Sequence, residues 1–410
     1  MQMGPIQAIA VYGQSHRGQS MGPQLQVEFE KRLGPMLLQM QFSVGAEILV
    51  LFGPSGAGKT QTLQAIAGLM RPDRGRIALD NTLFFRREAG ARSVHLPARK
   101  RRVGYVFQQY ALFPHLTALE NVAFPLAGRR DAHARAMALL ERMRLEHLAR
   151  RMPHELSGGQ QQRVAIARAL AAEPRVLLFD ESFSALDRRI RERLHADLRA
   201  LQAEQRLIVI YVTHNLDDAF AVGHRLAVVR DGRVEQIGQL DDVFTRPANR
   251  RVLEILGIPN AIAARVVEVT PAQTVLDWDG RLLAAPPLDL PPGAEVTAYI
   301  RPEDIRLIYP DRPLNRMLGQ NLLDGRVVER RPGRHLHHLR VALGDGHLVE
   351  VAHPASSYTT LPLPPGTPVR LVLRKESIVV IAPRSADGQR AAPATLLADP
   401  RDRGMAQDHG

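Results

Sequence analysis

The residue types needed to hold a chain of phosphates occur together in one octapeptide, Gly53-Pro54-Ser55-Gly56-Ala57-Gly58-Lys59-Thr60. An apolar, strand-like run at 47–52 precedes it and a helical pattern at 59–68 follows. The glycines let the backbone curl, so that successive N–H groups and the helix N-terminus face anionic phosphates. Lys59 adds a mobile positive charge, and the Thr60 hydroxyl can ligate Mg²⁺. A plain glycine-rich turn is the alternative, but the strand and the helix on either side favour a phosphate site. We include the adjoining Gln61 among the predicted residues of this site.

Two carboxylates end a second apolar run. Residues 176–179 are Val-Leu-Leu-Phe, and Asp180 and Glu181 follow directly. At the carboxyl end of a strand beside the phosphate loop, Asp180 can hold Mg²⁺ through water, and Glu181 can polarise a water that attacks a phosphate. Paired acids at a strand end are also common as charges near a helix N-terminus, so this pair alone leaves both interpretations open.

A polar glycine turn lies between these two elements, at Ser157-Gly158-Gly159-Gln160, and opens a helix predicted to run to about residue 172. The serine hydroxyl, the glycine N–H groups and the helix dipole could together face a second anion. An ordinary helix N-cap is the alternative for a serine at this position.

The elements that position these residues alternate between strands and helices from Leu25 to about Gly238, which indicates an α/β domain with a mainly parallel sheet. Besides the run at 47–52, buried strands are predicted at 102–107, 175–179, 207–212 and 226–230.

The C-terminal part differs in composition and contains an internal repeat. A polar, helical connector leads to short Val/Leu/Ile runs cut by Pro and Gly, the pattern of a small β domain. Asn260 and the run 265–268 recur as Asn321 and 326–329, which predicts two related β units, two small barrels. The predicted boundaries are a flexible extension at 1–23, a nucleotide-binding domain at 24–240, a linker at 241–258, the β domain at 259–382 and a disordered tail at 383–410.

The length and composition of the chain limit the classes of protein to which it can belong. A length of 410 residues suits two domains, and no apolar run approaches the roughly 20 residues that cross a bilayer. The absence of cysteines excludes disulfides, and the N-terminus lacks the features of a secretory signal, so a cytosolic location is expected. The formal charge of +12 comes from scattered arginines, and the one dense run, 99–102, is predicted to be a solvated loop and not a nucleic-acid patch.

Taken together, these motifs resemble those of the ATPase subunits of ABC transporters, and the turn at 157–160 matches the signature motif of that family. The resemblance covers about residues 24–382. It implies a P-loop NTPase with a RecA-like core and a helical subdomain, followed by an all-β, OB-like TOBE domain. It also implies that ATP and Mg²⁺ bind between two copies of the chain arranged head to tail, the signature of one copy closing on the ATP of the other.

Three more residues gain roles from the resemblance. Gln108 matches the family's Q-loop glutamine, which senses Mg²⁺ and the attacking water and couples to the membrane subunit. Asp187, in Ser184-Ala185-Leu186-Asp187, matches the D-loop and implies a contact with nucleotide. His214 matches the switch histidine that contacts the γ-phosphate. The resemblance implies a catalytic set of three residues, Glu181, His214 and Gln108. It implies a metal-binding set of Thr60, Gln108 and Asp180.

Two positions depart from the family pattern. Ser182 stands where proline is usual after the catalytic glutamate, and we expect hydrolysis to survive because proline has no charged or donor role there. No aromatic residue lies clearly where the family stacks adenine, and Phe29 is the best candidate.

The segment 110–117 is typical of the importer group, in which it helps receive the coupling helix of the membrane subunit. The implied partners are a second copy of the chain, permease subunits and, indirectly, an extracytoplasmic solute-binding protein, with no nucleic acid. The implied location is the cytoplasmic face of the membrane, as a peripheral subunit. A non-transport ABC ATPase of translation or repair would carry a second ATPase domain or a long coiled coil, and this chain has neither.

The C-terminal repeat resembles the TOBE/Mop-like domains of ATPases for molybdate, tungstate and sulfate, and related domains occur on those for sugars, polyamines and iron. Residues 48–52 with Ala57, and the segment 96–108, resemble the molybdate group. Molybdate or tungstate is therefore the first expectation for the solute, with sulfate next and sugar, polyamine or iron as alternatives. The same likeness raises a hypothesis that the C-terminal domain binds an oxyanion as a regulator, against a dimerisation or spacer role.

Overall fold

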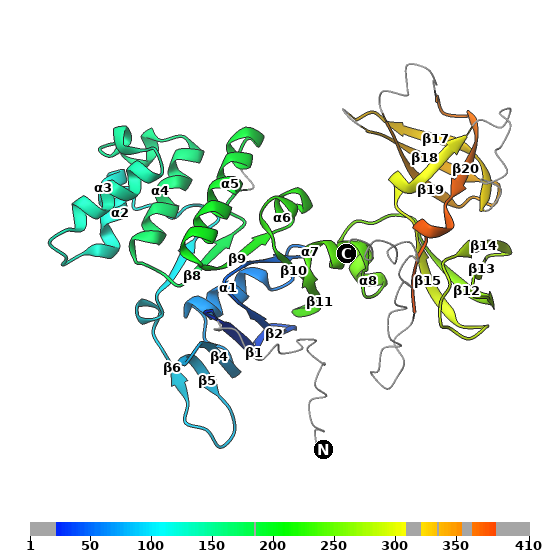
Figure 1. Cartoon of the computed structure of the whole chain (residues 1–410). Coiled ribbons are helices and arrows are strands. Elements are labelled where there is room, and N and C mark those ends of the chain that lie inside the picture. Colours follow the sequence, from blue (N-terminus) through cyan, green and yellow to red (C-terminus); the bar gives the residue numbers. More distant parts are fainter. Residues whose placement is uncertain (1–21, 184–185, 309–320, 334–335, 355–362, 383–410) are drawn as a thin grey trace, which may run out of the picture. The chain divides into compact units, whose positions relative to one another are not determined.

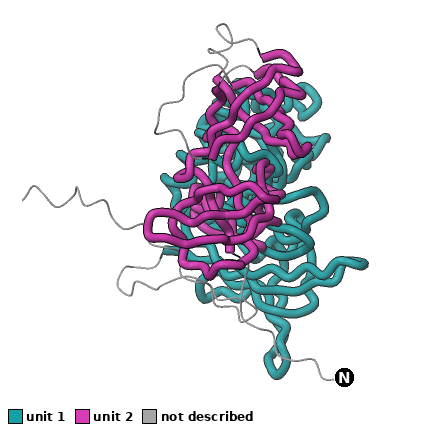
Figure 2. The backbone as a smooth tube through the Cα atoms, turned by 90° about the vertical axis from the view of Figure 1, so that its right-hand side faces the viewer, with its two compact units in different colours: residues 1–234 teal, residues 235–410 magenta. Residues whose placement is uncertain are grey.

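The computed structural model describes residues 22–183, 186–308, 321–333, 336–354 and 363–382. The predicted flexible extension, except its last two residues, the disordered tail at 383–410, and Ser184 and Ala185 lie outside the described residues. The chain divides into two compact units, 1–234 and 235–410 (Figure 2). Among the described residues, no helix combines the length and the apolar character needed to cross a membrane.

Unit 1 is built on a sheet of eleven strands with the order β6-β5-β4-β1-β2-β11-β10-β3-β9-β8-β7. Five of these strands form its parallel part: β10 (Arg225–Arg230), β3 (Ile48–Phe52), β9 (Ile208–Thr213), β8 (Val176–Asp180) and β7 (Val103–Val106). Every residue of β3, β8 and β9 is buried, which explains why these strands read as continuous apolar runs without alternation. The five strands predicted from sequence are all present, with bounds within two residues.

The sheet is mixed, which corrects the expectation of a mainly parallel one. Its other side is antiparallel: β1 (Leu25–Leu33), β2 (Met36–Val44), β4 (Arg74–Leu79), β5 (Thr82–Arg87) and β6 (Val94–His95). A two-residue turn joins β1 to β2 and another joins β4 to β5, and connections this short allow only antiparallel neighbours. The strand β11 (Arg233–Gln239) lies between β2 and β10.

The helices of unit 1 form two groups (Figure 1). Three contact the strands of the sheet or one another beside it: α1 (Lys59–Ala67), α5 (Arg188–Gln205) and α6 (Leu216–Val222). Three others enclose a separate apolar core: α2 (Ala118–Ala123), α3 (Ala132–Arg142) and α4 (Gly158–Ala171). Side-chain caps define the starts of α2, α4, α5 and α6, through Thr117, Ser157, Asp187 and Asn215 respectively.

Short 3₁₀ turns occur in both units, at Ala98–Lys100, Phe124–Leu126, Glu146–Leu148, Pro153–Glu155, Pro302–Asp304 and Lys375–Ser377.

One residue of the basic run at 99–102 is buried, contrary to the predicted solvated loop. Arg101 is 1% exposed, and its guanidinium lies over the ring of Phe84. Its Nη1 donates to the carbonyls of Ala65 and Ile66, each at 2.8 Å, and its Nε donates to the carbonyl of Leu96 at 2.8 Å. Burial lowers the pKa of Arg101 to about 10, so it remains charged at neutral pH. Arg101 thus caps the C-terminus of α1, where the backbone carbonyls and the helix dipole favour a cation.

Unit 2 begins with the helices α7 (Leu240–Thr245) and α8 (Arg250–Ile255) and continues as two antiparallel five-stranded sheets. The first sheet has the order β14 (Arg281–Ala285), β13 (Thr274–Trp278), β12 (Ala261–Val269), β15 (Glu295–Tyr299) and β21 (Val379–Ile381). The second has the order β16 (Ile305–Ile308), β20 (Pro368–Leu373), β17 (Leu322–Arg331), β18 (Leu336–Leu343) and β19 (Leu348–Pro354).

The two repeats are not the separate barrels that the sequence suggested, because they exchange their last strands. β16 belongs to the first repeat but pairs with β20 in the second sheet, and β21 belongs to the second repeat but pairs with β15 in the first sheet. Buried side chains of both sheets form one continuous apolar core. The pair of repeats is therefore a single folding unit.

The repeated asparagines join the two sheets. Asn260 exchanges two hydrogen bonds with the backbone of Glu350, each 2.7 Å, and Asn321 exchanges two with the backbone of Ala284, at 2.6 and 2.7 Å. Both asparagines have left-handed backbone conformations, with φ of 61° and 55°, which asparagine tolerates better than most residues. The repeat found in the sequence thus marks a symmetric pair of cross-sheet contacts.

Candidate functional site

The phosphate-binding loop leaves the end of β3 and enters α1 (Figure 1). Gly56 and Gly58 have φ of 82° and 98°, a region that disfavours residues with a Cβ. A Cβ on Gly53 would lie 2.1 Å from the carbonyl oxygen of Val229, so close packing against β10 also requires glycine. No side chain caps α1, which leaves the amide groups of its first turn directed toward the loop. The backbone therefore forms the anion cradle that the sequence predicted.

Lys59 is held inside this loop. Its Nζ donates to the carbonyls of Gly53 and Pro54 at 2.8 and 2.9 Å and lies 3.8 Å from Oε1 of Glu181. Burial lowers the pKa of Lys59, and the nearby charges of Glu181 and Asp180 oppose that shift. Phosphates bound in the loop would take the place of these two carbonyls as hydrogen-bond acceptors of the Lys59 ammonium.

Asp180 ends β8 beside the start of α1 and accepts one hydroxyl on each carboxylate oxygen. Thr60 Oγ1 donates to Oδ1 at 2.8 Å, and Tyr105 Oη donates to Oδ2 at 2.9 Å. Because the Thr60 proton is directed at the carboxylate, the lone pairs of its oxygen remain for a cation. A hydroxyl and a carboxylate are hard oxygen donors of the kind that Mg²⁺ prefers. The residues present therefore fit the predicted metal.

Glu181 and His214 form a pair just beyond the ends of the neighbouring strands β8 and β9. His214 Nδ1 lies 3.1 Å from Glu181 Oε2, and the Glu181 backbone N–H donates to the carbonyl of Val212 at 3.2 Å. Glu181 has φ of 45°, an uncommon conformation for a non-glycine residue, and such strain persists where the surrounding structure fixes it. The side chain of His214 is 54% exposed and that of Glu181 18% exposed, so the imidazole is the outer partner of the pair.

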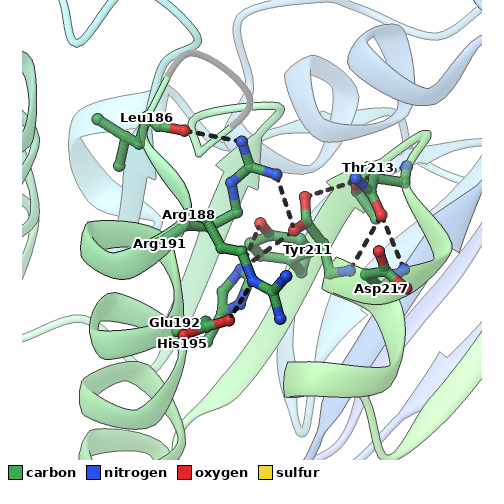
Figure 3. Close-up of polar contacts among 10 residues, drawn as sticks. Leu186, Arg188, Arg191, Glu192, His195, Tyr211, Thr213 and Asp217 are labelled. Atoms are coloured by element: carbon green, nitrogen blue, oxygen red, sulfur yellow. Dashed lines mark hydrogen bonds and ion pairs between the residues drawn. The ribbon is translucent and has the colours of Figure 1, made fainter. Parts of the chain in front are cut away.

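A buried polar network lies behind this pair (Figure 3). Asp218 Oδ2 accepts from the Thr213 hydroxyl at 3.3 Å, while Oδ1 lies 3.7 Å from both Arg191 Nη1 and His195 Nε2. Arg191 also donates to the carbonyl of Leu186 at 2.8 Å. Burial lowers the pKa of His195, which favours its neutral form, so Arg191 supplies the positive charge that balances Asp218. Of these residues, Arg191, Thr213 and Asp218 line a pocket of about 190 Å³ together with Glu181 and His214.

The other predicted site residues lie at the edges of this constellation. Gln108 is exposed, two residues beyond the end of β7, whose neighbour β8 carries Asp180. Asp187 is exposed and caps α5 by accepting from the N–H of Ile190 at 3.0 Å. Gln61 lies in the first turn of α1.

The turn at 157–160 caps α4. The Ser157 hydroxyl accepts from the Gln160 N–H at 3.4 Å, and the Gln160 side chain accepts from the Ser157 N–H at 2.8 Å. Within the described part of the chain, no hydrogen bond or ion pair joins this turn to the phosphate-binding loop. Within one copy, the turn therefore acts as an ordinary helix N-cap, which was the alternative to an anion site. Ser157 and Gly158 remain exposed.

Sequence reasoning missed Tyr105 and Asp218 and misplaced Phe29. Phe29 is 2% exposed in β1, inside the core, and cannot stack on a nucleotide base. Tyr105 and Asp218 act through neighbours that are distant in the sequence, so only their positions, three residues before Gln108 and four residues after His214, could have drawn attention to them.

Comparisons with known proteins identify the family. A family model described as ABC transporter matches residues 37–184, and one described as TOBE domain matches residues 298–381. The spermidine/putrescine import ATP-binding proteins PotA of Escherichia coli strain K12 and of Shigella flexneri are each 43% identical over 267 residues, which is 64% of this chain and 68% of theirs.

Two solved structures of the bacterial ABC transporter cassette MJ0796 cover 53% of this chain and 98% of their own. Both are dimeric: one has 34% identity and a TM-score of 0.46, and the other, a post-hydrolysis state bound to ADP and Pi, has 35% identity and a TM-score of 0.46. The identity to the PotA proteins, which extends over two thirds of their length, establishes the family. The chain belongs to the ATP-binding proteins of ABC transporters, which hydrolyse ATP, and carries a C-terminal all-β TOBE domain.

Proposed function

We propose that this chain is the ATP-hydrolysing subunit of an importer and that two copies close head to tail around two molecules of ATP. One observation carries the proposal. Lys59, Asp180 and Glu181 converge at the phosphate-binding loop, whereas the exposed glycine turn that begins at Ser157 lies on a different group of helices and has no bond to that loop within the described residues. A second copy can supply the turn as the other wall of the site.

The roles of the side chains follow from their positions. The loop amides and Lys59 bind the β- and γ-phosphates, and the Glu181 carboxylate orients a water toward the γ-phosphate and accepts its proton. His214, paired with Glu181 at 3.1 Å, donates to the γ-phosphate and holds that carboxylate in place. Thr60 and Asp180, with Gln108, would hold Mg²⁺, which when bound neutralises charge on the phosphates.

Replacement of the catalytic carboxylate tests this assignment. Glu181→Gln removes the base but keeps the size of the side chain, so ATP turnover is expected to fall at least about a hundredfold. ATP binding should persist, and size-exclusion chromatography with Mg-ATP should show a stable dimer. Glu88→Gln, an exposed substitution in the loop after β5, serves as the control. Turnover by Glu181→Gln at the unmutated rate would contradict the role of Glu181.

For the solute, the names of the PotA relatives favour the polyamines spermidine and putrescine, which stood among the alternatives. The first expectation, molybdate or tungstate, rests on residues around the phosphate loop that do not contact solute, and the comparisons lend it no support. Uptake of radiolabelled spermidine and molybdate, measured in cells with and without the gene, separates the two. Loss of molybdate uptake alone would exclude the polyamine assignment.

The proposed partners are permease subunits, which would place the chain at the cytoplasmic face of the membrane and link it indirectly to a solute-binding protein. The segment 110–117, which follows Gln108, supports this proposal because it begins with a turn in which Tyr110 is half-buried and Ala111 exposed, with φ of 59° and 47°. An oxyanion bound by the TOBE unit is a separate proposal. Calorimetry of the full chain with molybdate, tungstate and sulfate tests it, and no heat with any of them removes the regulatory role.

A further inference from the structure

We propose that Tyr105 is a positioning residue of the ATPase site, which fixes the Asp180 carboxylate in the orientation that receives the metal ion. This inference rests on the proposed role of Thr60 and Asp180 in holding Mg²⁺. It assigns to a tyrosine on β7 a function in metal binding, although its hydroxyl would contact only the carboxylate and not the metal or the nucleotide.

The hydrogen bonds at Asp180 define its orientation. Asp180 is 6% exposed, and its carboxylate has a different hydroxyl donor on each oxygen, Thr60 at 2.8 Å and Tyr105 at 2.9 Å. Rotation of the carboxylate plane would lengthen both bonds, and each involves a charged acceptor, which makes it stronger than a bond between neutral groups. The two donors come from α1 and β7, so the position of Asp180 is tied to two elements at once.

Of the two donors, Tyr105 is the more rigid. Its ring stacks on that of Phe107, with centroids 4.2 Å apart and planes inclined by 27°. Its hydroxyl donates to Asp180 Oδ2 at 2.9 Å while this stacking holds the ring in place. Thr60, in contrast, would have to place its oxygen toward the metal while its proton stays on Asp180. Tyr105 keeps the carboxylate fixed while the Thr60 hydroxyl takes up this geometry.

The same bond connects Asp180 to the segment that carries Gln108. β7 and β8 run parallel, with Val106 opposite Phe179, and Gln108 follows Tyr105 by three residues. Tyr105 therefore ties two of the three proposed metal-binding positions to one another. A purely structural role would instead stabilise the β7–β8 pairing without any specific effect on the metal.

Tyr105→Phe distinguishes these roles because it removes the hydroxyl and keeps the ring and its stacking on Phe107. The matched control is Tyr299→Phe in unit 2, where a buried tyrosine hydroxyl donates to the carbonyl of Thr245 at 2.8 Å. Electron paramagnetic resonance of free Mn²⁺ would measure metal binding to the full chain in the presence of ADP. Fluorescence of a labelled ADP in EDTA would measure nucleotide binding without metal.

In Tyr105→Phe the dissociation constant for Mn²⁺ is expected to rise about tenfold, the usual effect of removing a group that orients a metal ligand. ADP binding in EDTA should stay within about twofold of the unmutated protein, and Tyr299→Phe should leave both constants unchanged. Equal Mn²⁺ binding by Tyr105→Phe and the unmutated chain would overturn the role of Tyr105 alone, as would an equal loss of metal-free ADP binding. Failure of the unmutated chain to bind Mn²⁺ with ADP would overturn the proposed metal site and the role of Tyr105 with it.

Discussion

Ser182 lies directly after Glu181, the proposed catalytic base, at the position where proline is usual in the family. It is 1% exposed, and its Oγ is buried without a hydrogen-bond partner among the described residues. An enclosed hydroxyl of this kind costs free energy because it gives up its bonds with water. The serine therefore contributes neither a bond nor a charge to the site.

Ser182→Ala is expected to raise the free energy of unfolding by about 1 kcal/mol, since it removes the unsatisfied hydroxyl without creating a large cavity. ATP turnover should stay within about twofold, because the change leaves Glu181 and His214 in place. Urea denaturation and an ATPase assay measure the two quantities. Ser93→Ala, on an exposed loop, is the control for the loss of a serine hydroxyl that is not buried. If Ser182→Ala instead lowers the free energy of unfolding, the Ser182 hydroxyl has a hydrogen-bond partner.

The placement of single residues was predictable where sequence neighbours determine it. Lys59, Thr60, Asp180 and Glu181 each occupy a fixed offset from the end of a buried strand, and the structure brings them together. The remaining residues depend on partners from other strands and helices. Phe29 and Arg101 resemble an accessible aromatic residue and a solvated charge in the sequence, and only tertiary packing buries them.

At the scale of elements, α1 is fixed at both ends. Its N-terminus carries the phosphate-binding loop, and its C-terminus is held by the guanidinium of Arg101, which satisfies the carbonyls of Ala65 and Ile66. The sequence predicted the first contact from the glycines of the loop. The second could not be predicted, because 35 residues separate Arg101 from Ile66.

Arg101→Met should lower the free energy of unfolding of unit 1 by roughly 3 kcal/mol, because three buried carbonyls lose their donor. Arg99→Met, an exposed change in the same basic run, should have little effect. Chemical denaturation followed by circular dichroism compares the two variants. Similar effects of both would indicate that the bonds of Arg101 contribute little.

The polar network around Arg191 and Thr213 (Figure 3) links two helices near the proposed catalytic pair, Glu181 and His214. Arg191 on α5 holds the Leu186 carbonyl and faces Asp218 on α6, which in turn accepts from Thr213, the residue before His214. Asp218→Asn is expected to lower kcat about tenfold, because the turn that carries His214 loses its charged anchor, while the KM for ATP changes little. Asp217→Asn, at the exposed neighbouring position, is the control. An unchanged kcat would mean that the network only stabilises the fold.

At the scale of the whole molecule, the exchanged strands make unit 2 depend on its last residues. β21 forms an edge of the first sheet, where residues 379–381 pair with 297–299 of β15. The repeat was visible in the sequence, but repetition by itself does not specify which sheet a final strand joins.

A chain ending at Ile378 should have a unit 2 less stable by roughly 2 kcal/mol, since it loses the hydrogen bonds of β21. The single tryptophan, Trp278, is 4% exposed in the core of this unit, so its fluorescence in a urea titration reports on unit 2 alone. A chain ending at Ala382 keeps β21 and is the control. Equal midpoints for the two truncated chains would show that β21 is dispensable.

The exchanged strands also impose an order on biosynthesis. The strands of unit 1 that precede Val234 can pair while the ribosome is still translating the TOBE unit, but β15 must wait for β21, which follows the other described strands of that unit in the chain. Until the ribosome releases that segment, β15 presents an open edge on which another chain could pair. A premature stop codon or a long translational pause before residue 379 would therefore yield a finished ATPase unit attached to an aggregation-prone, incomplete sheet.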